Sequence, residues 1–148
     1  MNNDIRIAAA LVVRGDGRTL LVRKRGAATL QQPGGKIDPD ETAEAALLRE
    51  LAEEIGLAAD PAALRRLGAF AAPAANEPGR RVVAELFLLR VDALTPAPGA
   101  EIAEAVWIDP DAPGAAALAP LTGDVILPFW RAATARSEDQ APGAAQQE

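Results

Sequence analysis

The segment at residues 34–57, GGKIDPDETAEAALLRELAEEIGL, restricts the fold more than any other part of the sequence. Its apolar residues recur at the period of an α-helix, about 3.6 residues per turn, and so fall on a single face. That face carries Leu47, Leu48, Leu51 and Ile55. A helix with such a stripe must bury it, so the chain has to supply a second apolar layer for the helix to cover.

Short apolar runs bounded by turn residues predict the strands of that second layer. They lie at residues 5–13, 19–25, 34–37, 64–72, 81–91 and 105–108. The first two flank the turn Gly15-Asp16-Gly17 and predict a hairpin, and residues 121–133 predict a final helix. Strands interleaved with two helices predict an α/β domain built in layers.

The chain length of 148 residues fits one domain, which we place at residues 1–133. Residues 134–148 have no apolar anchor, and we expect them to form a disordered tail. The uncharged apolar runs are too short to span a bilayer, and the N-terminal segment is a poor match for a signal peptide. We therefore expect a cytoplasmic protein that makes no contact with a membrane.

The composition excludes several kinds of functional site. The sequence contains neither cysteine nor histidine, which rules out thiol chemistry and imidazole as a catalyst or metal ligand. Any metal ion must therefore be bound by oxygen atoms. The formal net charge is −6, so we expect no attraction to nucleic acid or anionic lipid, and a small anionic ligand would need a cation to bridge it to the protein.

The ends of the predicted helix are only partly defined by local rules. Either Asp38 caps its N-terminus, with Pro39 in the first turn, or Thr42 does so. These rules leave both starting points open. At the other end Gly56 is suited to a left-handed C-cap.

Glu50, Glu53 and Glu54 form a cluster on this helix, because positions i, i+3 and i+4 share one sector beside the apolar stripe. Carboxylates that close repel one another unless a cation offsets the repulsion. A Mg²⁺-type ion binds such oxygens and bridges to phosphates, which suits the hydrolysis of a phosphoanhydride. The alternative is an ordinary solvated acidic face, with Arg49 as a local partner.

A pair of glycines ahead of the helix favours the metal hypothesis. Gly34 and Gly35 would let the backbone approach a ligand or a metal ion closely. The segment is not a Walker P-loop, because Leu30 stands where that motif needs glycine and Ile37 where it needs serine or threonine.

One pattern extends across the whole segment: Gly35, five residues, Glu41, seven residues, and then RELAEEIGL from Arg49 to Leu57. It resembles the Nudix box, G-x5-E-x7-R-E-U-x-E-E-x-G-U with U aliphatic, at every fixed position. The resemblance implies an α/β/α sandwich with a mixed β-sheet over residues 4–133. It also implies a hydrolase of nucleoside diphosphates linked to a further group X.

The same resemblance implies roles for individual residues. The implied ligands of Mg²⁺ or Mn²⁺ are the side chains of three box glutamates and one backbone carbonyl, from Glu50, Glu53, Glu54 and Gly35. Glu50 would activate the attacking water, Arg49 and Glu41 would orient the loop and the helix, and Thr42 would cap the helix. The general base varies within the family, and Glu77, Glu101 and Glu104 are further candidates outside the box, each with the alternative of an ordinary surface carboxylate.

Two residues outside the box are candidates for substrate binding. Arg23 could bind substrate phosphates, with a charged strand end as the alternative, and Asn76 could hydrogen-bond a purine edge, with a turn asparagine as the alternative. The aromatic residues Trp107, Phe129 and Trp130 we assign to the core rather than to base stacking.

The resemblance leaves the substrate open. The compact chain looks like the MutT-type members that hydrolyse nucleoside triphosphates, oxidised ones included, to the monophosphate and pyrophosphate. Pro73, sixteen residues after Leu57, resembles instead a marker of ADP-ribose hydrolases. We favour the triphosphate, with ADP-ribose or another nucleotide sugar as the alternative and a non-catalytic nucleotide-binding module as the alternative of another class. The sequence does not distinguish a monomer from a homodimer.

Overall fold

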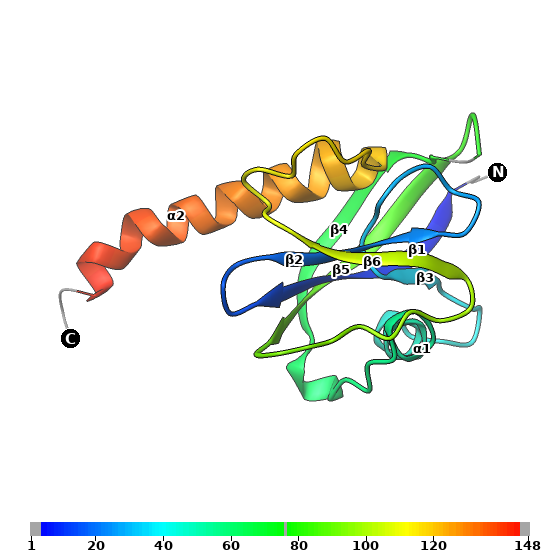
Figure 1. Cartoon of the computed structure of the whole chain (residues 1–148), viewed down its shortest axis with the longest axis horizontal. Coiled ribbons are helices and arrows are strands. Elements are labelled where there is room, and N and C mark those ends of the chain that lie inside the picture. The colour runs from blue at the N-terminus through cyan, green and yellow to red at the C-terminus, as the bar shows by residue number, and fades with distance from the viewer. Residues whose placement is uncertain (1–3, 76, 146–148) are drawn as a thin grey trace.

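The computed structural model describes residues 4–75 and 77–145, with side chains as far as Arg136. Within these residues the strands form one six-stranded mixed sheet in the order β4-β5-β1-β2-β6, with β3 paired to β1. The strands are β1 (Ile5–Arg14), β2 (Thr19–Lys24), β3 (Gly34–Lys36), β4 (Arg65–Pro73), β5 (Arg81–Val91) and β6 (Ile102–Ile108). The helices are α1 (Ala43–Ile55), a short 3-10 helix (Pro61–Ala63), a π-helical turn (Leu121–Ile126) and α2 (Leu127–Ala145). Helices α1 and α2 lie on opposite faces of the sheet (Figure 1).

Strand β1 is the centre of the molecule. It runs parallel to β5 and antiparallel to β2 and β3. Ala8, Ala10 and Val12 pack in the cluster beneath α1, whereas Leu11 and Val13 pack in the cluster that includes residues preceding and within α2. Burial on both faces explains why this strand is an uninterrupted apolar run rather than an alternating one. The predicted α/β/α sandwich with a mixed sheet is therefore confirmed, and so is the hairpin of β1 and β2.

Helix α1 begins at the later of the two predicted starts. The Thr42 hydroxyl accepts a hydrogen bond of 3.1 Å from the backbone N–H of Ala45, as an N-cap does. Gly56 has a φ of 69° and ends the helix in the left-handed conformation, as predicted. The buried face differs slightly from the predicted stripe, because Ala46 is fully buried whereas Leu48 is only half-buried.

The loop between β5 and β6 covers the C-terminal end of α1. The N–H of Ala97 donates to the carbonyl of Ile55, and the N–H of Gly99 donates to the carbonyl of Glu54, each at 3.0 Å. These bonds satisfy two of the carbonyl groups that a helix leaves without partners at its end. The loop therefore fixes the last turn of α1, which carries the side chains of Glu53 and Glu54.

Two boundaries differ from the prediction. Strand β6 begins at Ile102, three residues before the start at residue 105 that we predicted from its apolar run. Helix α2 continues to Ala145, past the predicted end at residue 133. Residues 134–145, which we predicted to be part of a disordered tail, are helical, whereas residues 146–148 lie outside the described residues, so disorder there remains a prediction. No described helix is both long and apolar enough to cross a membrane.

We expect Gly99→Ala to destabilise the protein by about 1–3 kcal/mol, the usual cost of forcing an extra carbon into a packed site. A Cβ at this position would collide with the backbone carbonyl of Glu53, which cannot swing aside as a side-chain end can. Chemical denaturation measures the change in the free energy of unfolding. Gly15→Ala is the matched control, because nothing lies within 4 Å of its added carbon. Equal stability of the two variants would contradict the role assigned to the loop.

Candidate functional site

Two glycines of β3 lie between the central strand and helix α1. Gly34 pairs with Ala9 and Gly35 with Ala8. Gly34 has a φ of 148°, and a Cβ there would collide with the carbonyl of Ala8. A Cβ on Gly35 would lie 2.5 Å from the carboxyl carbon of Glu50. Only glycine fits at position 34, and a side chain at position 35 would displace the carboxyl group of Glu50, because the backbone of β3 lies directly against that carboxylate of α1.

The side chain of Glu54 is buried at the same place. Its relative exposure is 6%, and its Oε1 accepts a hydrogen bond of 3.1 Å from the N–H of Gly34. Burial raises the pKa of the Glu54 carboxyl to about 7, although this hydrogen bond and the charge of Lys24 act in the opposite direction. The Lys24 ammonium lies 3.9 Å from Oε2. A cation placed closer would favour the ionised form of this carboxyl.

Arg49 connects the loop after β3 to helix α1. Its guanidinium donates two hydrogen bonds to Glu41, of 2.8 and 2.7 Å, one of 2.9 Å to Glu50 and one of 3.2 Å to the carbonyl of Lys36. The bidentate contact with Arg49 lowers the pKa of Glu41 to about 2. This geometry is the one needed to orient the loop against the helix.

The three box glutamates do not all point to one place. Glu50 and Glu54 both approach the glycine pair, whereas the side chain of Glu53 is 61% exposed and lies 3.8 Å from Arg49. Across residues 4–75 and 77–145, no three acidic side chains stand close enough together to hold a metal ion. Arg49 lies close to Glu50 and Glu53 and reduces the repulsion among the glutamates. The alternative to a metal site, an ordinary acidic face with Arg49 as its local partner, predicted this contact.

The residues present nevertheless suit a hard divalent cation. Carboxylate and carbonyl oxygens are the ligands that Mg²⁺ and Mn²⁺ prefer, and Glu50, Glu54 and the Gly35 backbone supply them within one small region. Burial disfavours the ionised form of Glu54, and a bound cation would reverse that effect. The carboxyl group of Glu53 is at the end of a flexible, exposed side chain. The metal assignment of all three glutamates remains a prediction.

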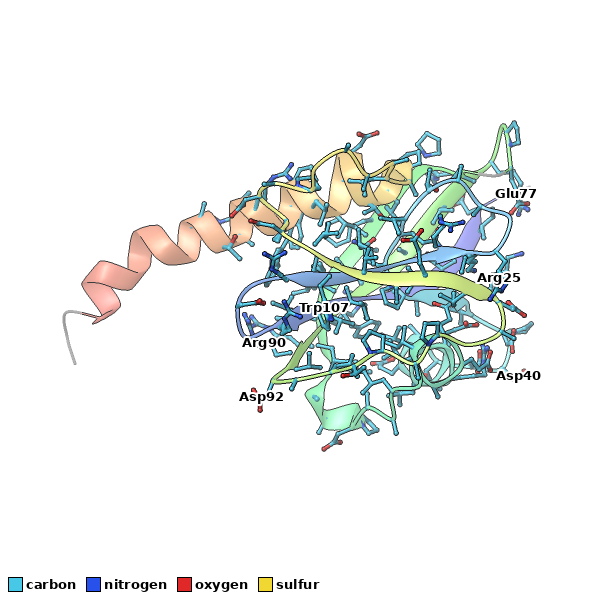
Figure 2. All side chains as sticks on the ribbon, in the orientation of Figure 1. Arg25, Asp40, Glu77, Arg90, Asp92 and Trp107 are labelled. Atoms are coloured by element: carbon cyan, nitrogen blue, oxygen red, sulfur yellow. The ribbon has the colours of Figure 1, made fainter. Side chains whose placement is uncertain are left out.

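A cavity of about 380 Å³ opens beside the glycine pair. Part of its wall is apolar, formed by Ile5, Ile7, Ala9, Val82, Leu121 and neighbouring residues. The polar part of the wall is formed by Lys24, Arg25, Gln31, Gln32, Lys36, Glu77 and Thr122. Figure 2 shows Arg25 and Glu77 at one edge of the layered domain, with Arg90 and Asp92 at the opposite edge. The cavity is therefore an apolar recess whose wall also contains cationic side chains and the glycine pair.

The sequence candidates outside the box are distributed unevenly around this cavity. Arg23 donates to Glu104 at 2.7 Å and to the carbonyl of Ala27 at 3.2 Å. Glu77 lines the cavity and accepts from Arg80 at 2.7 Å. Glu101 lies near enough to Glu54 to raise its pKa. Asn76 is outside the described residues. Binding of substrate by Arg23 or Asn76 remains a prediction.

From the run Arg23-Lys24-Arg25, sequence reasoning kept only Arg23 as a phosphate-binding candidate, whereas Lys24 and Arg25 line the cavity. It did not identify the wall residues Gln32 and Thr122. For Lys24 and Arg25 the reason is local, because the pairing of β2 with β6 shifts its register between Arg23 and Lys24. Such an irregularity redirects the side chains that follow, and simple alternation cannot predict it. Gln32 and Thr122 are far apart in sequence, and no motif joins them.

Known proteins share this sequence pattern and this fold. The model of the NUDIX domain family matches residues 4–127. An 8-oxo-dGTP diphosphatase of Haemophilus influenzae is 31% identical over 126 residues, covering 82% of this chain and 88% of that protein. A MutT-like protein of Streptomyces ambofaciens is 45% identical over 49 residues, which span only 32% of its length and 33% of this chain. The solution structure of the E. coli ORF135 protein superimposes with a TM-score of 0.69 at 26% identity, covering 91% of this chain and 94% of that one.

We expect Glu41→Gln to make the free energy of unfolding less dependent on pH between about pH 4.5 and pH 2. The pKa of Glu41 is about 2 in the folded protein against an ordinary value of 4.5, so its stabilising contribution is complete above about pH 4.5 and is lost as the pH falls toward 2. Urea denaturation at intervals across this range measures the slope. Glu44→Gln, an exposed acid in the first turn of α1, is the control and should keep the slope of the wild type. Identical slopes for all three proteins would contradict a stabilising contact between Glu41 and Arg49.

Proposed function

The chain belongs to the Nudix family of hydrolases, and from this premise we propose that it is a divalent-metal-dependent pyrophosphohydrolase of nucleoside triphosphates. Its products would be the nucleoside monophosphate and pyrophosphate, with an oxidised base as one form of the substrate. The observation that carries the proposal is that Gly34 and Gly35 line the cavity and also contact the side chains of Glu54 and Glu50, which do not themselves line it. The relative from Haemophilus influenzae, an 8-oxo-dGTP diphosphatase, supports the same substrate class.

The cavity wall suits the two chemically different parts of a nucleotide. The apolar side, formed by residues such as Ile7, Val82 and Leu121, offers a surface for a base. Lys24, Arg25 and Lys36 offer positive charge for the phosphates. The net charge of −6 already includes these three residues, so the attraction that they offer a triphosphate is local to the cavity wall.

The reaction adds water across a phosphoanhydride. The oxygen of water forms a bond to phosphorus, the bridging P–O bond breaks, and the water proton passes to a base. A divalent cation bound by Glu50, Glu53, Glu54 and the Gly35 carbonyl would neutralise phosphate charge and make the bound water more acidic. By the family resemblance Glu50 would accept the proton, and its carboxyl group lies against the Gly35 backbone, beside the proposed metal ligands.

The other residues of the box would keep these groups in place. Arg49 holds the carboxylate of Glu50 and, through Glu41 and the Lys36 carbonyl, the loop that follows β3. Glu54 is held by the Gly34 N–H. A substrate would therefore meet carboxylates whose positions are already set by hydrogen bonds, which lowers the cost of organising the site.

Hydrolysis of ADP-ribose or another nucleotide sugar is the second candidate. Pro73, the residue that resembles a marker of ADP-ribose hydrolases, ends β4 and lines the cavity. Its place in the wall would allow it to contact a substrate. A panel of dNTPs, oxidised dNTPs, ADP-ribose, NADH and dinucleoside polyphosphates, each assayed with Mg²⁺ and with Mn²⁺, separates the two candidates. If no compound is hydrolysed, the chain is better described as a nucleotide-binding module.

We expect Glu50→Gln, Glu53→Gln and Glu54→Gln each to lower kcat by roughly 10²–10⁴-fold, the range of a general base, while the fold remains intact. Each change removes the charge of a proposed metal ligand and keeps the shape of the side chain. Steady-state kinetics and circular dichroism of the purified variants provide the two readouts. Glu44→Gln, exposed on the same helix, should retain the kcat of the wild type. Turnover equal to the wild type in all three variants would exclude the metal-site assignment.

We expect Gly35→Ala to abolish most activity with little loss of stability. The added Cβ would meet the carboxyl end of Glu50, which can rotate away, so the fold survives but the catalytic carboxylate is displaced. Thermal unfolding and the rate of pyrophosphate release measure the two effects. Full activity in this variant would show that the contact between Gly35 and Glu50 has no catalytic importance.

A further inference from the structure

The side-chain amide of Gln32 has a hydrogen-bond partner for its oxygen but none for its nitrogen. Its side chain lines the cavity and is almost completely buried, with 4% relative exposure. The Oε1 atom accepts a hydrogen bond of 2.8 Å from the hydroxyl of Thr122. The Nε2 atom is also buried, and it is the one buried side-chain nitrogen or oxygen in the described part of the chain without a hydrogen-bond partner.

The backbone around this amide is firmly held. Gln31 exchanges two hydrogen bonds of 2.8 Å with Val22 of β2, and the carbonyl of Pro33 accepts one of 3.0 Å from Ala10 of β1. Thr122 is fully buried in the π-helical turn that precedes α2. Gln32 and Thr122 therefore face each other from two fixed elements, and the amide cannot easily move to find another partner.

An unpartnered buried N–H is unfavourable in the free protein, because folding has removed it from water without replacing the lost hydrogen bond. Such groups in native structures call for an explanation. The hydroxyl of Thr122 bonds one side of the amide and leaves the other side as a donor. Turning the amide over would place the oxygen at the unpartnered position and make the free group an acceptor, so a role of Gln32 as a donor depends on the orientation in which the Thr122 hydroxyl donates to Oε1.

We propose that Gln32 is a specificity-determining residue, whose amide N–H donates a hydrogen bond to a carbonyl oxygen on the base of the bound nucleotide. Thr122 is the positioning residue that holds the amide in the donating orientation. This inference rests on the proposed function, since it assumes that the cavity receives a nucleotide base. The substrate class that follows is a nucleotide with a keto base, guanine or uracil in type.

Amino bases are the natural contrast. Adenine and cytosine carry an NH₂ group where guanine and uracil carry a carbonyl oxygen, so the Gln32 donor would meet another donor. A site built to form a hydrogen bond discriminates strongly against a ligand that cannot form it, because the buried group then stays without a partner. We expect the wild type to bind GMP about tenfold or more tightly than AMP, and UMP more tightly than CMP.

Equilibrium binding of these four nucleoside monophosphates, measured by isothermal titration calorimetry, tests the inference without requiring turnover. Gln32→Leu should bring the GMP to AMP ratio close to one, and Gln32→Glu, which presents only acceptors when ionised, should bring it below one. Thr122→Val frees the amide to rotate and should also weaken the preference. Thr95→Val is the control for the loss of a hydroxyl, because Thr95 is exposed and does not line the cavity, and this variant should keep the preference of the wild type.

Stability provides a second readout. Gln32→Leu alone would leave the buried hydroxyl of Thr122 without its acceptor, so the double variant Gln32→Leu/Thr122→Val, which removes both polar groups, is the one expected to fold and to melt at or above the temperature of the wild type. A wild type that shows no preference between GMP and AMP, or a Gln32→Leu variant that keeps the full preference, would overturn the inference. A wild type that prefers GMP yet hydrolyses no nucleotide would overturn the proposed function alone.

Discussion

The close approach of β3 to its neighbours is the contact on which the rest of the site depends. The backbone at Gly34 packs against Ala8 of the central strand, and the backbone at Gly35 packs against the carboxyl group of Glu50. Any side chain at either position would push β3 away from β1 or push the carboxylate away from β3. The N–H of Gly34 could then no longer reach Glu54 in its buried position. The absence of a Cβ at Gly34 thus lets β3 pair closely with β1, and its absence at Gly35 lets the Glu50 carboxylate lie against β3.

The arrangement of charge follows from that contact. Carboxylates held near a backbone and partly removed from water need positive charge nearby, and Arg49 and Lys24 supply it. Arg49 also binds Glu41, so the same guanidinium both screens the glutamates and fastens the loop. The acidic crowding in the sequence therefore has a structural explanation that is compatible with the metal hypothesis. Arg49 neutralises part of the negative charge of these glutamates, and a cation bound at Glu50 and Glu54 would neutralise more of it.

The local features of this fold could be predicted from sequence, and the long-range ones could not. The period of α1, its Gly56 cap and the uninterrupted apolar run of β1 depend on neighbours in sequence, and the structure confirms each of them. The choice of Thr42 as N-cap required the family resemblance, because the local rules were balanced. The outward position of Glu53 and the loop bonds of Gly99 depend on packing. Helical spacing places three glutamates in one sector, but it does not fix the rotamers of their side chains.

The segment at residues 31–36 links the two halves of the proposed chemistry. Gln32 faces the cavity, and Gly34 and Gly35 face the carboxylates of α1, within one short stretch of chain. Hydrogen bonds to β2 and β1 hold that stretch at both Gln31 and Pro33. A base recognised at Gln32 would therefore place its phosphates at a distance from Glu50 that the backbone itself fixes. Reaction rates are sensitive to displacements of about 1 Å. Because the connection is rigid, binding of the base at Gln32 would also position the phosphoanhydride bond relative to Glu50.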